Sequence, residues 1–142
     1  MYLIDYCLLF FTSIGAATLL PGGSEALLLY YTNEGLNTLT LLLTSSIGNT
    51  LGSVINFFLG KYLSSWAIRK NYLKLSYVKK SKNYFDKYGA FALLFSWLPI
   101  LGDPITFCAG VLKYNFILFT LLVFISKFSR YAFLIYAYNL FI

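Results

Sequence analysis

Residues 35–60 constrain the fold most strongly, because this run of 26 residues contains no charged side chain. A helix rises about 1.5 Å per residue and needs about 20 apolar residues to cross a hydrocarbon core of about 30 Å. The run is therefore long enough to span a bilayer as one helix. Composition agrees, since 59% of the residues are hydrophobic and only 11% are charged, whereas soluble domains carry about 25% charged residues. We predict an all-α integral membrane protein.

The residue types argue against most catalytic chemistry. The chain has no histidine and only two cysteines, Cys7 and Cys108. These numbers disfavour most metal sites, histidine-based catalytic triads and any disulfide framework beyond one bridge. We therefore expect neither an enzyme nor a bound cofactor.

A basic segment separates two apolar regions. Eight of the 11 basic residues lie in residues 61–87, where Asp86 is the only acid. A short basic segment between apolar segments follows the positive-inside rule, which places residues 61–87 in the cytoplasm of a bacterium and makes the protein a multi-pass inner-membrane protein. Leucine and aromatic residues recur at helical spacings within it, as expected for an amphipathic helix on anionic lipid head groups. A solvated loop without function is the alternative, and we expect no nucleic-acid partner.

The two apolar regions, 1–60 and 88–142, repeat one pattern around this segment and form a single membrane domain with it. Each begins with an apolar block that is interrupted by helix-breaking residues, and we expect those residues to shape a re-entrant helical hairpin. They are Pro21, Gly22 and Gly23 in the first block and Pro99, Gly102 and Pro104 in the second. A long apolar segment follows each block. The sequence therefore predicts two halves, each a re-entrant hairpin plus a transmembrane helix.

An offset of 78 positions aligns the two halves without a gap. It places Pro21 on Pro99, and each half then has the sequence Leu-Pro-x-x-small-acid, ending at Glu25 or Asp103. The same offset places Asn49 on Lys127. If the two hairpins enter from opposite sides, the halves form an inverted repeat, an arrangement that transporters use to bring broken helices together at the membrane midplane.

Four charged residues lie inside otherwise apolar segments: Glu25, Asp103, Lys127 and Arg130. An uncompensated charge at such depth costs at least about 2.5 to 3.5 kcal/mol, so we expect acid–base pairs between hairpins and long helices. In a functional interpretation the acids titrate and the bases receive an anionic head group, with Arg130 best suited to hold phosphate in a bidentate fork. In the alternative interpretation the ions only join the hairpins.

Small residues follow one face of the first long segment. Gly48, Gly52 and Gly60 are spaced for close helix packing, although Gly-x-x-x-Gly is a weak motif by itself. Asn49 lies on the same segment, where it either faces a cavity or only packs.

Four motifs together closely resemble the YqaA family, a short branch of the DedA membrane proteins, whose domain is also called the VTT or SNARE-associated Golgi protein domain. The resemblance covers almost the whole chain. The motifs are Leu19-Leu20-Pro21-Gly22-Gly23-Ser24-Glu25-Ala26, Gly48-Asn49-Thr50-Leu51-Gly52 through Gly60, Ser96-Trp97-Leu98-Pro99-Ile100-Leu101-Gly102-Asp103-Pro104, and Lys127-x-x-Arg130-Tyr131.

This resemblance implies an inner-membrane protein with two facing re-entrant hairpins, in a superfamily linked to the movement of phospholipids or polyprenyl-phosphate carriers and to the proton-motive force. Ser96 and Gly102 stand where longer DedA proteins carry arginine, which leaves Lys127 and Arg130 to bind an anion. We therefore predict a transporter, flippase or scramblase of a lipid or lipid-linked anion. Proton coupling stays open, and a homodimer is one way to enclose a cavity. The alternative is a membrane scaffold that supports envelope integrity without transport.

Overall fold

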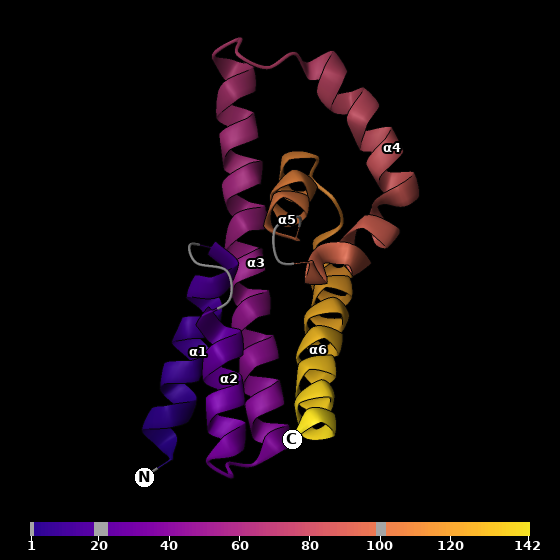
Figure 1. Ribbon diagram of the computed structural model, residues 1–142. Coiled ribbons are helices and arrows are strands. Elements are labelled where there is room, and N and C mark those ends of the chain that lie inside the picture. Colours follow the sequence, from indigo (N-terminus) through magenta and orange to yellow (C-terminus); the bar gives the residue numbers. More distant parts are fainter. Residues whose placement is uncertain (1, 19–22, 99–101) are drawn as a thin grey trace.

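The computed structural model describes residues 2–18, 23–98 and 102–142 (Figure 1). Every regular element in these ranges is a helix, which confirms the predicted all-α class. The elements are α1 (Leu3–Thr18), α2 (Gly23–Asn33), α3 (Thr38–Arg69), α4 (Leu75–Leu94), the 3₁₀ helix η1 (Phe95–Trp97), α5 (Gly102–Val111) and α6 (Phe116–Phe141). By length and composition, α3 and α6 could each cross a membrane.

Helix α3 is longer than the charge-free run from which it was predicted. It begins at Thr38 because the side chain of Asn37 caps it by accepting a hydrogen bond from the backbone N–H of Thr40. It continues nine residues past Gly60, since no glycine or proline follows before Arg69. The basic segment 61–87 is therefore the end of α3, a turn and the first part of α4, and not a separate loop.

The long helices form the frame on which the shorter ones pack. Figure 1 shows α3 and α6 running in opposite directions, with α1 and α2 beside the first part of α3 and α5 beside its later part. The contacts on α3 are too close for larger residues. A Cβ added at Gly48 would lie 2.7 Å from the carbonyl oxygen of Phe10 in α1, and one added at Gly60 would collide with the carbonyl oxygen of Phe107 in α5. Helix α3 thus packs closely against α1 of the first half and α5 of the second half.

The offset of 78 positions found in the sequence also relates the helix ends. Helices α2 and α5 end at Asn33 and Val111, and helices α3 and α6 begin at Thr38 and Phe116. Both short helices end in a Schellman motif with a left-handed residue: Gly35 (φ 83°) after α2 and Lys113 (φ 53°) after α5. Both long helices begin with an asparagine cap, Asn37 and Asn115. The two halves therefore share their backbone design at these turns.

Two apolar clusters fill the interior at different levels. The first joins α1, α2, α3 and α6 through Leu9, Leu28, Tyr31, Leu36, Leu41, Tyr131 and Ile135. The second joins α3, α4, α5, α6 and the turn before α6 through Phe57, Leu93, Ala109, Tyr114, Phe119 and Val123. Along α6, the buried polar residues Ser126 and Lys127 lie between the parts of the helix that belong to the two clusters. A polar layer thus separates the two apolar clusters.

Candidate functional site

A pocket of about 370 Å³ lies where α2, η1 and α6 meet. Its lining residues come from both halves of the chain: Glu25 from α2, Trp97 from η1, and Ser129, Arg130, Phe133 and Leu134 from α6. Trp97 and Phe133 are 43% and 68% exposed, so the pocket opens at the outer surface of the helix bundle. Apart from one acid and one base, the lining is mainly apolar.

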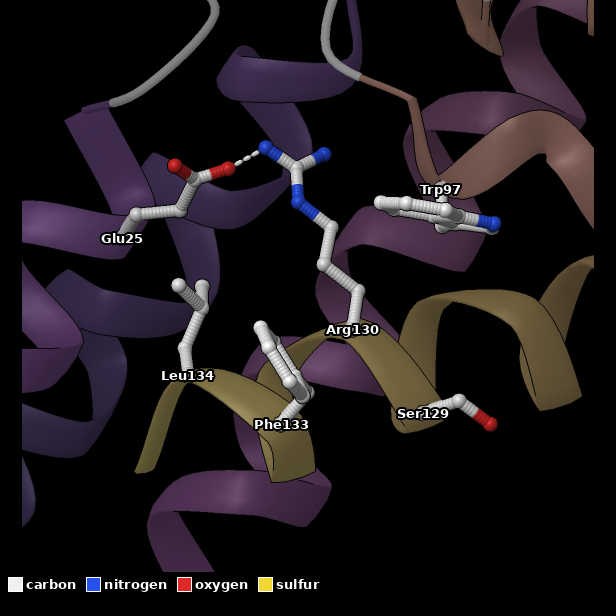
Figure 2. Close-up of a pocket in the computed structure, with 6 residues that line it drawn as sticks. All are labelled: Glu25, Trp97, Ser129, Arg130, Phe133 and Leu134. Atoms are coloured by element: carbon white, nitrogen blue, oxygen red, sulfur yellow. Dashed lines mark ion pairs between the residues drawn. The ribbon is translucent and has the colours of Figure 1, made fainter. Parts of the chain in front are cut away.

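The two charges in the pocket form an ion pair. The guanidinium of Arg130 contacts the carboxylate of Glu25, and only 12% and 25% of the two side chains are exposed. Figure 2 shows the guanidinium directed at the carboxylate, with the indole of Trp97 on the other side of the arginine. Each charge neutralises the other in an apolar surrounding, which is how a charge becomes tolerable at such a position. The pairing of a hairpin acid with a base on α6 matches one of the combinations expected from the sequence.

A buried set of polar side chains lies next to this pair. The hydroxyl of Tyr131 is 2.8 Å from the hydroxyl of Ser24 and accepts a hydrogen bond of 2.9 Å from the side-chain amide of Asn49. The amide oxygen of Asn49 is buried and has no hydrogen-bond partner among the described residues. Asn49 therefore binds a phenol and does not line the pocket. This set connects α2, α3 and α6 immediately behind the ion pair.

Lys127 lies one helical turn before Arg130, but its surroundings are different. It is only 2% exposed and interacts electrostatically with Asp103 at the start of α5, and it does not line the pocket. The structure records no ion-pair contact between these two residues, both of which it describes. Of the four predicted ions, it thus brings Glu25 and Arg130 into contact at the pocket, while Asp103 and Lys127 interact across a longer distance.

The remaining predicted residues belong to the packing of the helices. Gly23 and Gly102 are the first residues of α2 and α5, and Pro104 lies in the first turn of α5, where a proline disturbs no helical hydrogen bond. Gly52 is buried in α3. Pro21, Gly22 and Pro99 lie outside the described residues. Within the described ranges, no three histidine, cysteine or acidic side chains come together as a metal site would require.

Sequence reasoning predicted only Glu25 and Arg130 among the described residues that line the pocket, and it assigned no site role to Trp97, Ser129, Phe133 or Leu134. Trp97 forms one wall of the pocket, while Ser24 and Tyr131 hold the set behind it. Ser24 and Tyr131 each adjoin a charged residue in the sequence, Glu25 and Arg130. Their positions next to a charged residue in an otherwise apolar segment were the signal available, but an adjacent residue normally points to another face of a helix.

The chain is similar to known proteins along most of its length. Residues 11–140 match the VTT domain family. The chain belongs to this family. It is 36% identical to the inner membrane protein YqaA of Escherichia coli over 106 residues, which cover 74% of this chain and 70% of YqaA. It is also 34% identical to an uncharacterized protein of Haemophilus influenzae over 138 residues, covering 92% of this chain and 85% of that protein. No solved structure matches the chain.

Membership of the VTT domain family, with YqaA as a relative, confirms the resemblance noted in the sequence. The name of YqaA describes an inner membrane protein and gives no reaction. Together with the two long apolar helices, it supports a membrane location for this chain.

Proposed function

We propose that this VTT domain protein moves a lipid or lipid-linked anion between the two leaflets of a bacterial inner membrane. The observation that carries the proposal is the pocket itself, because it combines a largely buried arginine with an apolar lining and opens at the surface of the bundle. A lipid has the same two parts, a polar head group and apolar chains. Intramembrane ions beside a cavity are functional sites by default.

The proposed topology places α3 and α6 across the bilayer and the two hairpins, α1–α2 and α4–α5, within it as an inverted repeat. Its support is the common offset of the helix ends and the opposite directions of α3 and α6. With 32 residues, α3 is about 48 Å long and exceeds the hydrocarbon core, whereas the 11 residues of α2 reach about half-way across it. The basic turn between α3 and α4 is then cytoplasmic, where it meets anionic head groups.

In the proposed mechanism Arg130 receives the phosphate of the head group. A guanidinium offers two parallel N–H donors to a phosphate and stays charged at any relevant pH. Glu25 neutralises Arg130 while the pocket holds no lipid. The acyl or prenyl chains remain in the bilayer and pass the pocket over Phe133 and Leu134, so only the head group has to cross inside the protein.

The experiment measures lipid movement between leaflets in proteoliposomes, using a fluorescent phospholipid and a polyprenyl phosphate. Wild type is compared with Arg130→Ala and Asp103→Asn, with and without an imposed pH gradient. Arg69→Ala, at the exposed end of α3, is the matched control for loss of one arginine. We expect Arg130→Ala to abolish movement and Arg69→Ala to keep it. Movement retained in a well-folded Arg130→Ala protein contradicts the role of this residue.

A membrane scaffold without transport is the second candidate, because the Glu25–Arg130 contact joins the first hairpin to the long helix of the second half. A scaffold predicts no movement of either lipid by folded wild-type protein. It also predicts that neutralising lysines of segment 61–87 harms envelope integrity more than neutralising Glu25 or Asp103 does.

A further inference from the structure

The outer face of α4 takes no part in the pocket or in the packing of the helices. The buried residues of α4 are Gly89 and Leu93, and the ring of Phe85 packs edge-on against Tyr114 in the turn before α6. These contacts lie in the second half of the helix and on one side of it, as the splayed position of α4 in Figure 1 also indicates. The opposite side of α4 is exposed along its length.

This exposed side carries a stripe of residues spaced alternately by three and four positions. Such a spacing places side chains on one face of a helix. The buried Gly89 and Leu93 each follow a stripe residue by two positions, which places them on the opposite face. All six residues of the stripe, which we call the α4 stripe, are exposed: Tyr77, Lys80, Tyr84, Lys87, Phe91 and Leu94.

The first part of the α4 stripe is basic. A hollow of about 340 Å³ is lined by four neighbouring residues: Lys80, Asn83, Tyr84 and Lys87. Neither lysine forms an ion pair with a residue that the structure describes. The one acid of α4, Asp86, is exposed and lies outside the stripe. The hollow therefore offers an anion two ammonium groups that no carboxylate has neutralised.

The last part of the α4 stripe is apolar. Phe91 and Leu94 are 67% and 39% exposed, and exposed apolar groups of this size are favourable against hydrocarbon but not against water. A second hollow, of about 310 Å³, adjoins the first at Tyr84, and the small residues Gly89 and Ala92 form part of its lining. One face of α4 thus changes from basic and phenolic to apolar along the chain.

A phospholipid has the same order of groups, a phosphate followed by apolar chains. We propose that the outer face of α4 binds an anionic phospholipid, with the phosphate between Lys80 and Lys87 and the chains along Phe91 and Leu94. An acidic protein or a nucleic acid satisfies the lysines but leaves the two apolar residues without a partner. Tyrosine is also enriched where head groups meet hydrocarbon.

This site is separate from the pocket between α2, η1 and α6, and its lipid is a bound partner and not the molecule that is moved. In the proposed topology the lipid belongs to the cytoplasmic leaflet, whose anionic lipids attract basic segments. Binding at α4 requires only that the chain lies in a membrane, so it holds whether or not the pocket moves a lipid.

Lysine footprinting in nanodiscs tests the site residue by residue. The wild-type protein is treated with a membrane-impermeant acetylating reagent in phosphatidylcholine alone and in an equal mixture with phosphatidylglycerol, and mass spectrometry gives the acetylation rate of each lysine. We expect phosphatidylglycerol to slow Lys80 and Lys87 by at least about fivefold. Lys82 is the internal control, because it is exposed between them in sequence but lies outside the stripe, and its rate should change by less than about twofold.

Two outcomes of the footprinting overturn the inference. Equal slowing of Lys80, Lys82 and Lys87 shows a general effect of the charged surface and no site. Slowing of Lys80 and Lys87 by inorganic phosphate in phosphatidylcholine alone shows that the hollow binds a soluble anion and that the lipid chains contribute nothing.

Paired substitutions test the same site by lipid binding. Native mass spectrometry measures the phosphatidylglycerol that the detergent-solubilised protein retains from an equal mixture with phosphatidylcholine. Lys80→Gln/Lys87→Gln should weaken this binding about 25-fold, or about fivefold for each lysine. The matched control is Lys79→Gln/Lys82→Gln, which removes two exposed charges from the same helix outside the stripe and should weaken it by less than about threefold. Equal losses in the two double variants, or no preference of wild type for phosphatidylglycerol, overturn the inference.

Discussion

The two halves of the molecule have the same helix ends and caps, but their acidic side chains make different contacts. Each short helix ends in a Schellman motif and each long helix begins at an asparagine cap, at positions 78 residues apart. The acids at equivalent positions differ, however. Glu25 contacts a base and lies in a pocket, whereas Asp103 reaches its base only over a longer distance. The repeat therefore sets where the helices start and stop, while the site depends on which side chains the other half supplies.

The largest difference in loss of stability is expected between substitutions of two bases one turn apart on α6, Arg130 and Lys127. Replacing Arg130 by Met leaves Glu25 without its partner, and breaking a buried pair in this way costs about 3 to 5 kcal/mol. Lys127→Met removes a buried base that has no ion-pair contact in the described structure, so its effect should stay below about 1 kcal/mol. Thermal unfolding in detergent measures both. Equal losses of stability would show that Asp103 and Lys127 form as strong a pair as Glu25 and Arg130.

The second contrast concerns the contacts of the two hairpins with the long helices. Gly60→Ala places a methyl group against the backbone of α5 and should destabilise the protein by about 1 to 3 kcal/mol, the usual cost of overpacking. Gly15→Ala in α1 is the control, since a Cβ there lies more than 4 Å from the atoms of the described residues outside its own helix turn and alanine is the better helix former by about 0.5 to 1 kcal/mol. The unfolding temperature should therefore fall for Gly60→Ala and hold or rise for Gly15→Ala.

A smaller contrast between variant and control is expected for the polar set behind the pocket. Tyr131→Phe removes a hydroxyl that contacts Ser24 and Asn49, and the buried groups left without a partner cost about 1 to 3 kcal/mol. The residue at the equivalent position of the first half is Ser53, whose one hydrogen bond to the described residues goes to the carbonyl of Asn49 in its own helix. Ser53→Ala should cost less than about 1 kcal/mol. If it costs as much as Tyr131→Phe, the polar set is not specific to one half.

The smallest effect on stability is expected for the asparagine caps that α3 and α6 have in common. Asn37→Ala and Asn115→Ala each remove a cap from a long helix, and each should cost about 1 kcal/mol. Chemical denaturation of the two variants under one condition measures the costs. Costs that differ by much more than the error would show that the two turns are alike in geometry but not in energy.

Local signals in the sequence predicted much of the fold. The charge-free run 35–60 indicated the helix that became α3, and the offset of 78 positions also relates the ends of α2 and α5 and the starts of α3 and α6. Pro21 and Pro99, on which the predicted hairpins rest, lie outside the described residues. The end of that helix was wrong by nine residues, because charge marks the membrane boundary and not the end of helical hydrogen bonding. Trp97 and Tyr131 were missed for a different reason. Their roles depend on how η1 and α6 are rotated against α2, and no spacing within one segment specifies that rotation.

The position of α5 on α3 has a consequence for biosynthesis. The second hairpin docks on a helix of the first half and not mainly on the helix that follows it. A chain that emerges from the ribosome in order has therefore completed the docking surface before the hairpin that needs it is made. The first half therefore provides a preformed surface on which the second half folds. A protein cut in the turn after Arg69 should accordingly reassemble when both pieces are synthesised together, and the second piece alone should be degraded.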